Sequence, residues 1–149
     1  LEYPLAVALA ERHGASLIDL PDFSHPLAIK HALIELEPRK AAHYYDLGET
    51  LRASRRWTDA AAAYETALAL SATTHDEALP EEPLVLHMIG ESLLRAGEFD
   101  RAAQAYTRLH QSYPDNPLGA SMLQLVAYRK LLSEQDTPDV EQLRELFGN

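Results

Sequence analysis

The chain has 149 residues, a formal net charge of −10 at pH 7 and no cysteine. The acidic balance argues against a nucleic-acid partner, because phosphate binding draws its affinity from clustered Lys and Arg. The absence of Cys excludes disulfides, thiolate zinc sites and cysteine nucleophiles. No apolar run reaches the roughly 20 residues of a membrane span, so we expect no direct membrane insertion.

The first forty residues predict two helices, over residues 3–13 and 25–37. Between them we expect irregular packing around the stretch LIDLPDF. The overlapping stretch SLIDL also fits a short strand, because it is an apolar run beside a proline.

The strongest signal in the chain is a pattern that occurs twice, around Gly48 and Gly90. In each copy, apolar residues recur at three- and four-residue intervals on both sides of a polar break, ASRR or AGEF. This spacing predicts two amphipathic helices per copy, and therefore two helical hairpins. The expected structural positions are Tyr44, Leu47, Gly48, Leu51, Trp57, Ala60 and Tyr64 in the first copy, and Leu86, Ile89, Gly90, Leu93, Phe99, Ala102, Tyr106 and the closing Pro114 in the second.

The two glycines need a physical reason, because Gly costs about 1 kcal/mol against Ala inside a helix. We expect the small faces at Gly48 and Ala60, and at Gly90 and Ala102, to oppose each other. The helix axes then approach toward the lower end of the usual range of about 8–10 Å. The alternative, that both glycines end helices, is disfavoured because apolar residues continue on the same face beyond each of them.

The breaks between paired helices also carry signals. Gly97 is expected to take a left-handed conformation that ends the first helix of the second hairpin. Thr58 and Asp100 are good N-cap residues for the two second helices.

This arrangement resembles the tetratricopeptide repeat family, whose unit carries an aromatic residue, Leu-Gly, a bulky residue, a small Ala, an aromatic residue, Ala and Pro. The resemblance covers residues 41–74 and 83–116. It implies an all-α solenoid of antiparallel helix pairs, stacked into a right-handed superhelix with a concave binding face. Three positions depart from the pattern: Arg55 replaces the turn glycine, Ala72 the terminal proline, and Leu109 a small alanine.

The family period of 34 residues organises the rest of the chain. One period before Gly48 stands Gly14, so residues 7–40 are expected to form a degenerate repeat. Gly48 and Gly90 lie 42 residues apart, which requires an acidic insertion at 75–82, either as a longer loop or as an extra helical turn after Leu70. Residues 117–133 predict a capping helix and residues 139–147 a short terminal helix. We expect one helical-repeat domain over 1–149.

No catalytic motif is present: there is no GxSxG elbow, Walker loop, HExxH or dinucleotide fingerprint. The seven histidines are dispersed along the chain, so we predict no metal site. We also expect no cofactor and no enzymatic activity.

The resemblance implies that the first helix of each hairpin faces a partner. The corresponding exposed positions are Tyr45, Asp46, Glu49 and Arg52, then His87, Met88, Glu91, Leu94 and Arg95, and on the capping helix Ser121, Met122, Leu125, Tyr128 and Arg129. Such a groove suits a basic or apolar peptide or helix of another protein. The Lys and Asn clamp of the chaperone-binding subgroup is missing, because these offsets carry Tyr45, Asp46, Glu49 and Glu91.

Simpler interpretations of these positions stay open. Glu49 with Arg52, and Glu91 with Arg95, have the spacing of ion pairs along a helix surface. Met122 and Leu125 also suit the packing core of the capping helix.

Three functions fit the sequence: a non-catalytic adaptor or assembly scaffold, a self-associating structural solenoid that forms a homo-oligomer, and the docking or regulatory domain of a larger enzyme. The chain begins at Leu1, as a trimmed fragment does. We favour a cytoplasmic location, and a periplasmic one stays open. The abundance of Ala and Leu favours a bacterial source.

Overall fold

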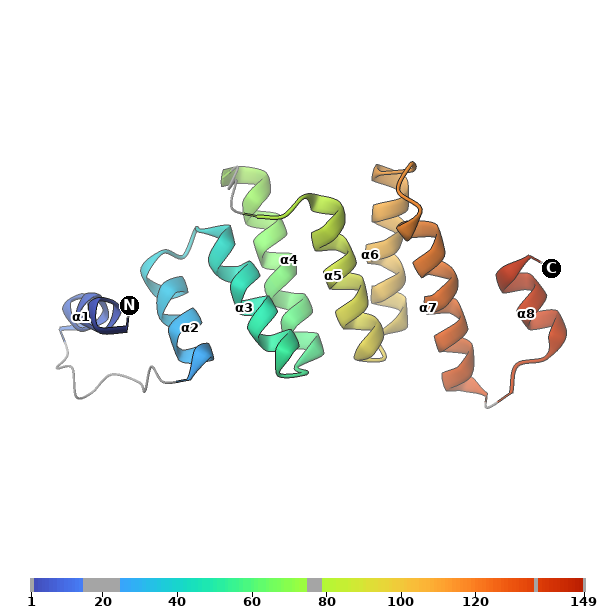
Figure 1. Ribbon diagram of the computed structural model, residues 1–149, viewed down its shortest axis with the longest axis horizontal. Helices are drawn as coiled ribbons and strands as arrows, with labels where there is room; N and C mark the ends of the chain where they lie inside the picture. Colours follow the sequence, from blue (N-terminus) through green and yellow to red (C-terminus); the bar gives the residue numbers. More distant parts are fainter. Residues whose placement is uncertain (1, 15–24, 75–78, 136, 149) are drawn as a thin grey trace. The chain divides into compact units, whose positions relative to one another are not determined.

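The computed structural model describes residues 2–14, 25–74, 79–135 and 137–148. Within these ranges it contains eight α-helices and no strand (Figure 1). The predicted all-α fold of repeated helical hairpins is therefore confirmed. The helices are α1 Glu2–His13, α2 Pro26–Leu36, α3 Ala41–Ala53, α4 Trp57–Thr74, α5 Glu82–Arg95, α6 Phe99–Ser112, α7 Leu118–Glu134 and α8 Val140–Phe147.

The helices group into two compact units, Leu1–Leu79 and Pro80–Asn149. Unit 1 contains α1 to α4 and unit 2 contains α5 to α8, and within each unit every helix packs against the next one along the chain. The boundary between the units falls inside the insertion expected at 75–82. A single domain over 1–149 stays a prediction.

Unit 1 begins with the helix pair α1 and α2, which share a small apolar cluster. Leu5 and Leu9 of α1 are buried against Ala32 of α2. The stretches LIDLPDF and SLIDL lie outside the described residues. The helix α3 follows after a short turn, and its buried His43 places Nε2 3.0 Å from Oε1 of Glu37. This contact, followed by the charge of Lys40, lowers the pKa of Glu37.

The hairpin of α3 and α4 explains Gly48. A Cβ atom on this residue would lie 2.7 Å from Cε1 of the Tyr64 ring, which is fully buried. The prediction that Gly48 is small in order to oppose Ala60 is thus corrected. The glycine makes room for the aromatic ring of the second helix, while Ala60 is buried in the same hairpin.

The hairpin of α5 and α6 repeats this contact. A Cβ atom on Gly90 would lie 2.6 Å from Cζ of the buried Tyr106 ring, so the pairing expected with Ala102 is corrected in the same way. The helix α7 approaches α6 through Gly119, whose Cβ would lie 2.9 Å from Cα of His110. Small residues therefore set the close helix contacts in both units.

The turns inside the two hairpins share one backbone geometry. In the α3–α4 turn, the amide of Arg56 donates to the carbonyl of Leu51 and the amide of Arg55 to that of Arg52. The α5–α6 turn has the same pair of bonds, from Glu98 to Leu93 and from Gly97 to Leu94. These are the two hydrogen bonds of a Schellman motif, which needs a left-handed residue directly after the C-cap. That residue is Arg55, with φ 60°, in one hairpin and Gly97, with φ 78°, in the other.

This geometry also decides where the second helices begin. The helix α4 begins at Trp57 and α6 at Phe99, each one residue before the predicted N-cap. The prediction that Thr58 and Asp100 are N-caps is therefore wrong, since both lie within the first helical turn. The Schellman turn brings the backbone directly into the next helix without a side-chain cap at Glu98.

The second helices differ in length because of the residue at the position of Pro114. The helix α6 ends at Ser112, just before this proline, which cannot continue a helix. The equivalent residue in the first hairpin is Ala72, and α4 runs on to Thr74. The extra helical turn that was one of the two alternatives after Leu70 is therefore present.

Candidate protein-interaction surface

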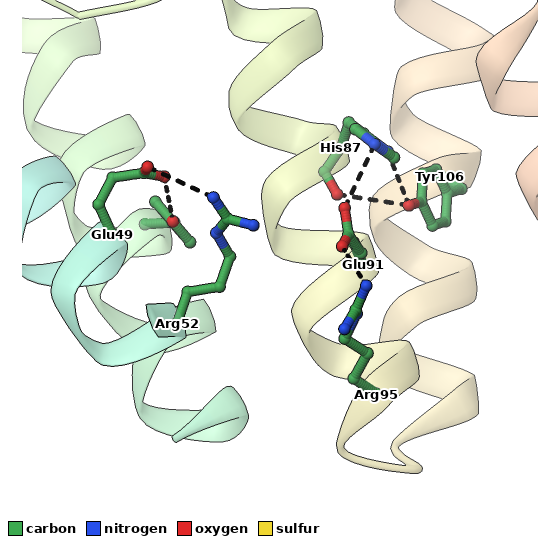
Figure 2. Close-up of polar contacts among 7 residues, drawn as sticks. Glu49, Arg52, His87, Glu91, Arg95 and Tyr106 are labelled. Carbon is green, nitrogen blue, oxygen red and sulfur yellow. Dashed lines mark hydrogen bonds and ion pairs between the residues drawn. The ribbon is translucent and has the colours of Figure 1, made fainter. Parts of the chain in front are cut away.

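On α3, the carboxylate of Glu49 is held by groups from two helices. The Tyr64 hydroxyl of α4 donates a hydrogen bond of 2.5 Å to Oε1, and Nη2 of Arg52 lies 3.5 Å from Oε2 (Figure 2). Glu49 follows Gly48 directly, so a Tyr64 ring that packs against Gly48 also places the Tyr64 hydroxyl next to the Glu49 carboxylate. The contact fixes one of the residues predicted to face a partner.

Tyr64 remains a hydrogen-bond donor over the ordinary pH range. Burial of the side chain, and then its hydrogen bond to the Glu49 carboxylate, raise the pKa of Tyr64 far above its usual value. The Tyr45 ring lies 5.4 Å from the Tyr64 ring and tilted to it by 55°. Burial, followed by the charge of Glu49, also raises the pKa of Tyr45. Asp46, one residue further on, is exposed.

On α5, the equivalent tyrosine meets a histidine. The Tyr106 hydroxyl of α6 lies 2.9 Å from Nδ1 of His87 and 3.3 Å from the His87 carbonyl oxygen (Figure 2). Nε2 of His87 lies 3.5 Å from Glu91, whose other carboxylate oxygen lies 3.1 Å from Nη2 of Arg95. Burial, and then the charge of Glu91, raise the pKa of Tyr106.

The imidazole of His87 lies between the Tyr106 hydroxyl and the Glu91 carboxylate. With the ring proton on Nε2, Nδ1 accepts a hydrogen bond from the Tyr106 hydroxyl, and Nε2 faces the carboxylate of Glu91.

The other predicted positions are distributed between exposed and covered places. Met88 is only 8% exposed and contributes to the core of unit 2, whereas Leu94 is half-buried. On α7, Ser121 and Arg129 are exposed, while Met122 and Leu125 are half-buried. Tyr128 is half-buried, and its ring lies 5.8 Å from that of Phe147 on α8. The ion pairs anticipated along α3 and α5 are both present.

Sequence reasoning missed the polar role of Tyr64 and Tyr106. Both were assigned to packing, yet each hydroxyl reaches a residue on the first-helix face. The available signal was the choice of Tyr over Phe at the same position of both copies, since a buried Tyr hydroxyl usually has a hydrogen-bond partner.

Among the described residues, no group of three or more His, Asp or Glu side chains is arranged to hold a metal ion. Of the helices that the structure describes, none is both long and apolar enough to cross a membrane.

The fold and its repeated faces define a helical-repeat protein. The family model for the tetratricopeptide repeat matches residues 28–75, 45–117 and 87–130, which together span more than half of the chain. The chain belongs to the tetratricopeptide repeat family. Repeats of this family generally mediate protein–protein interaction or scaffolding and are typically non-catalytic. No curated protein matches the chain.

Proposed function

We propose that this chain is a non-catalytic adaptor or assembly module that binds a peptide or helix of another protein, with one binding face on α3 in unit 1 and another on α5 and α7 in unit 2. The observation that carries this proposal is the repeated tyrosine contact. In both hairpins a buried second-helix hydroxyl holds a partly exposed first-helix side chain, Glu49 or His87. Side chains fixed before binding lose less freedom when a partner arrives, so this arrangement favours recognition.

The faces differ in the chemistry that they offer. On α3, the exposed Asp46 beside Glu49 suits a basic side chain of the partner. On α5 and α7, the half-buried Leu94, Met122 and Leu125 suit apolar anchors, which supply most of the affinity in such contacts. A basic segment therefore suits the α3 face of unit 1, and an apolar segment suits the α5 and α7 faces of unit 2.

Peptides selected from a random library on the full 149-residue chain test the proposal. We expect the selected peptides to be basic and apolar, and to shift amide resonances on α3, α5 and α7. Asp46→Asn and Leu94→Ala should each raise Kd by about fivefold, roughly 1 kcal/mol, in calorimetric titrations.

Two variants on the outer faces are the matched controls. Ala62 on α4 and Gln104 on α6 are exposed, so Ala62→Gln and Gln104→Ala should bind like the wild type. If the selected peptides instead contact α4 and α6, or bind Asp46→Asn and Leu94→Ala unchanged, the proposed surface is wrong.

A further inference from the structure

The C-terminal helix α8 carries its own start and stop signals. Asp139 accepts a hydrogen bond from the amide of Gln142, and the Gln142 side chain accepts one from the Asp139 amide, which completes a capping box. Gly148 ends the helix in the left-handed conformation. Between these caps, apolar residues recur at helical spacing: Val140, Leu143, Leu146 and Phe147.

This helix is seated on a face of α7 where we expected a partner. The Phe147 ring meets the Tyr128 ring edge-on, with ring centres 5.8 Å apart and planes inclined by 61°. At the other end of the contact, the Gln135 side chain donates to Gln142. Within unit 2, α8 lies next to α7 (Figure 1).

The seat of α8 is shallow. None of its residues is buried, and Val140 and Phe147 remain 63% and 47% exposed. An isolated helix of this length is unstable in water, so α8 depends on its caps and on the contact with α7. A helix that makes so limited a contact can leave its place at low cost.

We propose that α8 is an intramolecular occupant of a binding face on α7 around Tyr128, and that the external ligand of this face is an amphipathic helix with an aromatic anchor. The inference rests on the proposed function, because it takes the α7 face to be a binding surface. The chain's own segment shows the chemistry that the face accepts: apolar side chains at helical spacing that end in a phenylalanine. A partner helix of this kind competes with α8, which lowers its apparent affinity by the fraction of molecules in which the face is open.

A labelled peptide with the sequence TPDVEQLRELFGN, which is the chain's own C-terminal segment, is the probe. It is titrated into the full chain as wild type and as Phe147→Ala, a substitution that weakens the seat of α8. We expect Phe147→Ala to bind the peptide about tenfold more tightly, as for a face that is closed about nine-tenths of the time. Amide shifts should centre on Tyr128, and circular dichroism should show that the variant keeps its helices.

The matched control is Val140→Ala, which removes an apolar side chain from a more exposed position of the same helix. It should bind the peptide like the wild type. Adding Tyr128→Ala to Phe147→Ala should abolish the gain, since the aromatic contact on α7 is then lost.

Three outcomes overturn the inference. The first is equal affinity of wild type and Phe147→Ala for the peptide. The second is a gain that survives Tyr128→Ala. The third is a concentration-dependent mass in light scattering that Val140→Ala and Phe147→Ala both abolish, which would assign these side chains to a contact with a second copy.

The same experiments test the proposed function independently of the inference about α8. Library peptides that bind α3 and α5 equally well in wild type and Phe147→Ala would support that function even if the segment peptide shows no gain. A gain in peptide affinity that depends on Tyr128, with no library peptide bound on α3 or α5, would support the binding face on α7 and refute the proposed binding on α3 and α5.

Discussion

The hairpins α3–α4 and α5–α6 share the packing of a tyrosine ring against a glycine and differ in the group that the tyrosine hydroxyl meets. In both, a glycine of the first helix receives the buried ring of a second-helix tyrosine. The hydroxyl then meets a carboxylate, Glu49, in one hairpin and an imidazole, His87, in the other. The ring contact defines the hairpin, whereas the hydroxyl contact belongs to the exposed face. The ring contact that defines the hairpin can therefore be kept while the residues on the exposed face of the first helix differ.

The largest expected effect comes from adding a side chain at Gly48 or Gly90, where the tyrosine ring packs. Gly90→Leu and Gly48→Leu each gain helix propensity of about 1 kcal/mol and lose more through overpacking, about 3 kcal/mol, against the tyrosine ring. The net loss of about 2 kcal/mol should be larger for Gly90, because its would-be Cβ lies 2.6 Å from the ring Cζ, against 3.0 Å at Gly48. Urea unfolding monitored by circular dichroism measures both losses.

The sequence contains one tryptophan, Trp57 on α4, so its fluorescence reports the effect of Gly48→Leu within unit 1. Ala62→Leu and Gln104→Leu, at exposed positions of α4 and α6, are the controls and should change stability by less than about 0.5 kcal/mol. A higher midpoint for either glycine variant would contradict the close contact.

Removing the tyrosine hydroxyls alone should destabilise the two hairpins by different amounts. Tyr64→Phe loses a hydrogen bond to a charged group and should destabilise the chain by about 1.5 kcal/mol. The Tyr106 hydroxyl meets Nδ1 and the carbonyl oxygen of His87 and no carboxylate, so Tyr106→Phe should cost about 0.5–1 kcal/mol. Urea unfolding gives both values, with Tyr44→Phe, a half-buried tyrosine of α3, as control. Equal losses in the two hairpins would mean that the charge on Glu49 contributes nothing.

Alkaline pH tests the same hydroxyls in another way. The pKa of Tyr64 is about 10 in the unfolded chain and is raised in the folded one by burial and by Glu49. Above pH 10 the unfolded state therefore binds fewer protons, so the free energy of unfolding falls as pH rises, by at most about 1.4 kcal/mol per pH unit for one tyrosine.

Tyr64→Phe should flatten this fall between pH 10 and pH 11 in denaturant titrations at each pH. Gln104→Ala removes an exposed side chain that does not titrate, so it should leave the slope of the wild type. A slope that is unchanged in Tyr64→Phe would show that this tyrosine titrates normally in the folded chain.

The elements that sequence predicted well are those set by apolar periodicity and by proline. The hairpin helices follow the three- and four-residue spacing, and α6 ends before Pro114 as expected. The starts of α4 and α6 were misplaced because cap preference was applied to Thr58 and Asp100, whereas the Schellman turn continues into the helix through its own backbone bonds. The backbone geometry at the end of the first helix, and not the N-cap preference of single residues, therefore determines where the second helix begins.

The candidate surface was less accessible to sequence. Offsets within the repeat predicted that Glu49 and His87 face a partner, because helical spacing determines which positions share a face. The same offsets could not show that Met88 is buried, nor that Tyr128 is covered by Phe147. The second fact depends on a contact between two helices, α7 and α8, and periodicity carries no information about such contacts.

The smallest expected effect lies in the turns, where Arg55 stands at the position of Gly97. An L-residue in the left-handed region is strained by its Cβ, so Arg55→Gly should raise the free energy of unfolding by about 0.5–1 kcal/mol. Arg55→Ala removes the charge but keeps the Cβ, and so separates this strain from the favourable position of a cation near a helix C-terminus. Gly97→Ala should lower the stability by about 1 kcal/mol in the same urea titrations. If Arg55→Ala stabilises as much as Arg55→Gly, the strain of a Cβ in the left-handed region does not account for the effect, and the two turns are not equivalent in the way that their backbone bonds indicate.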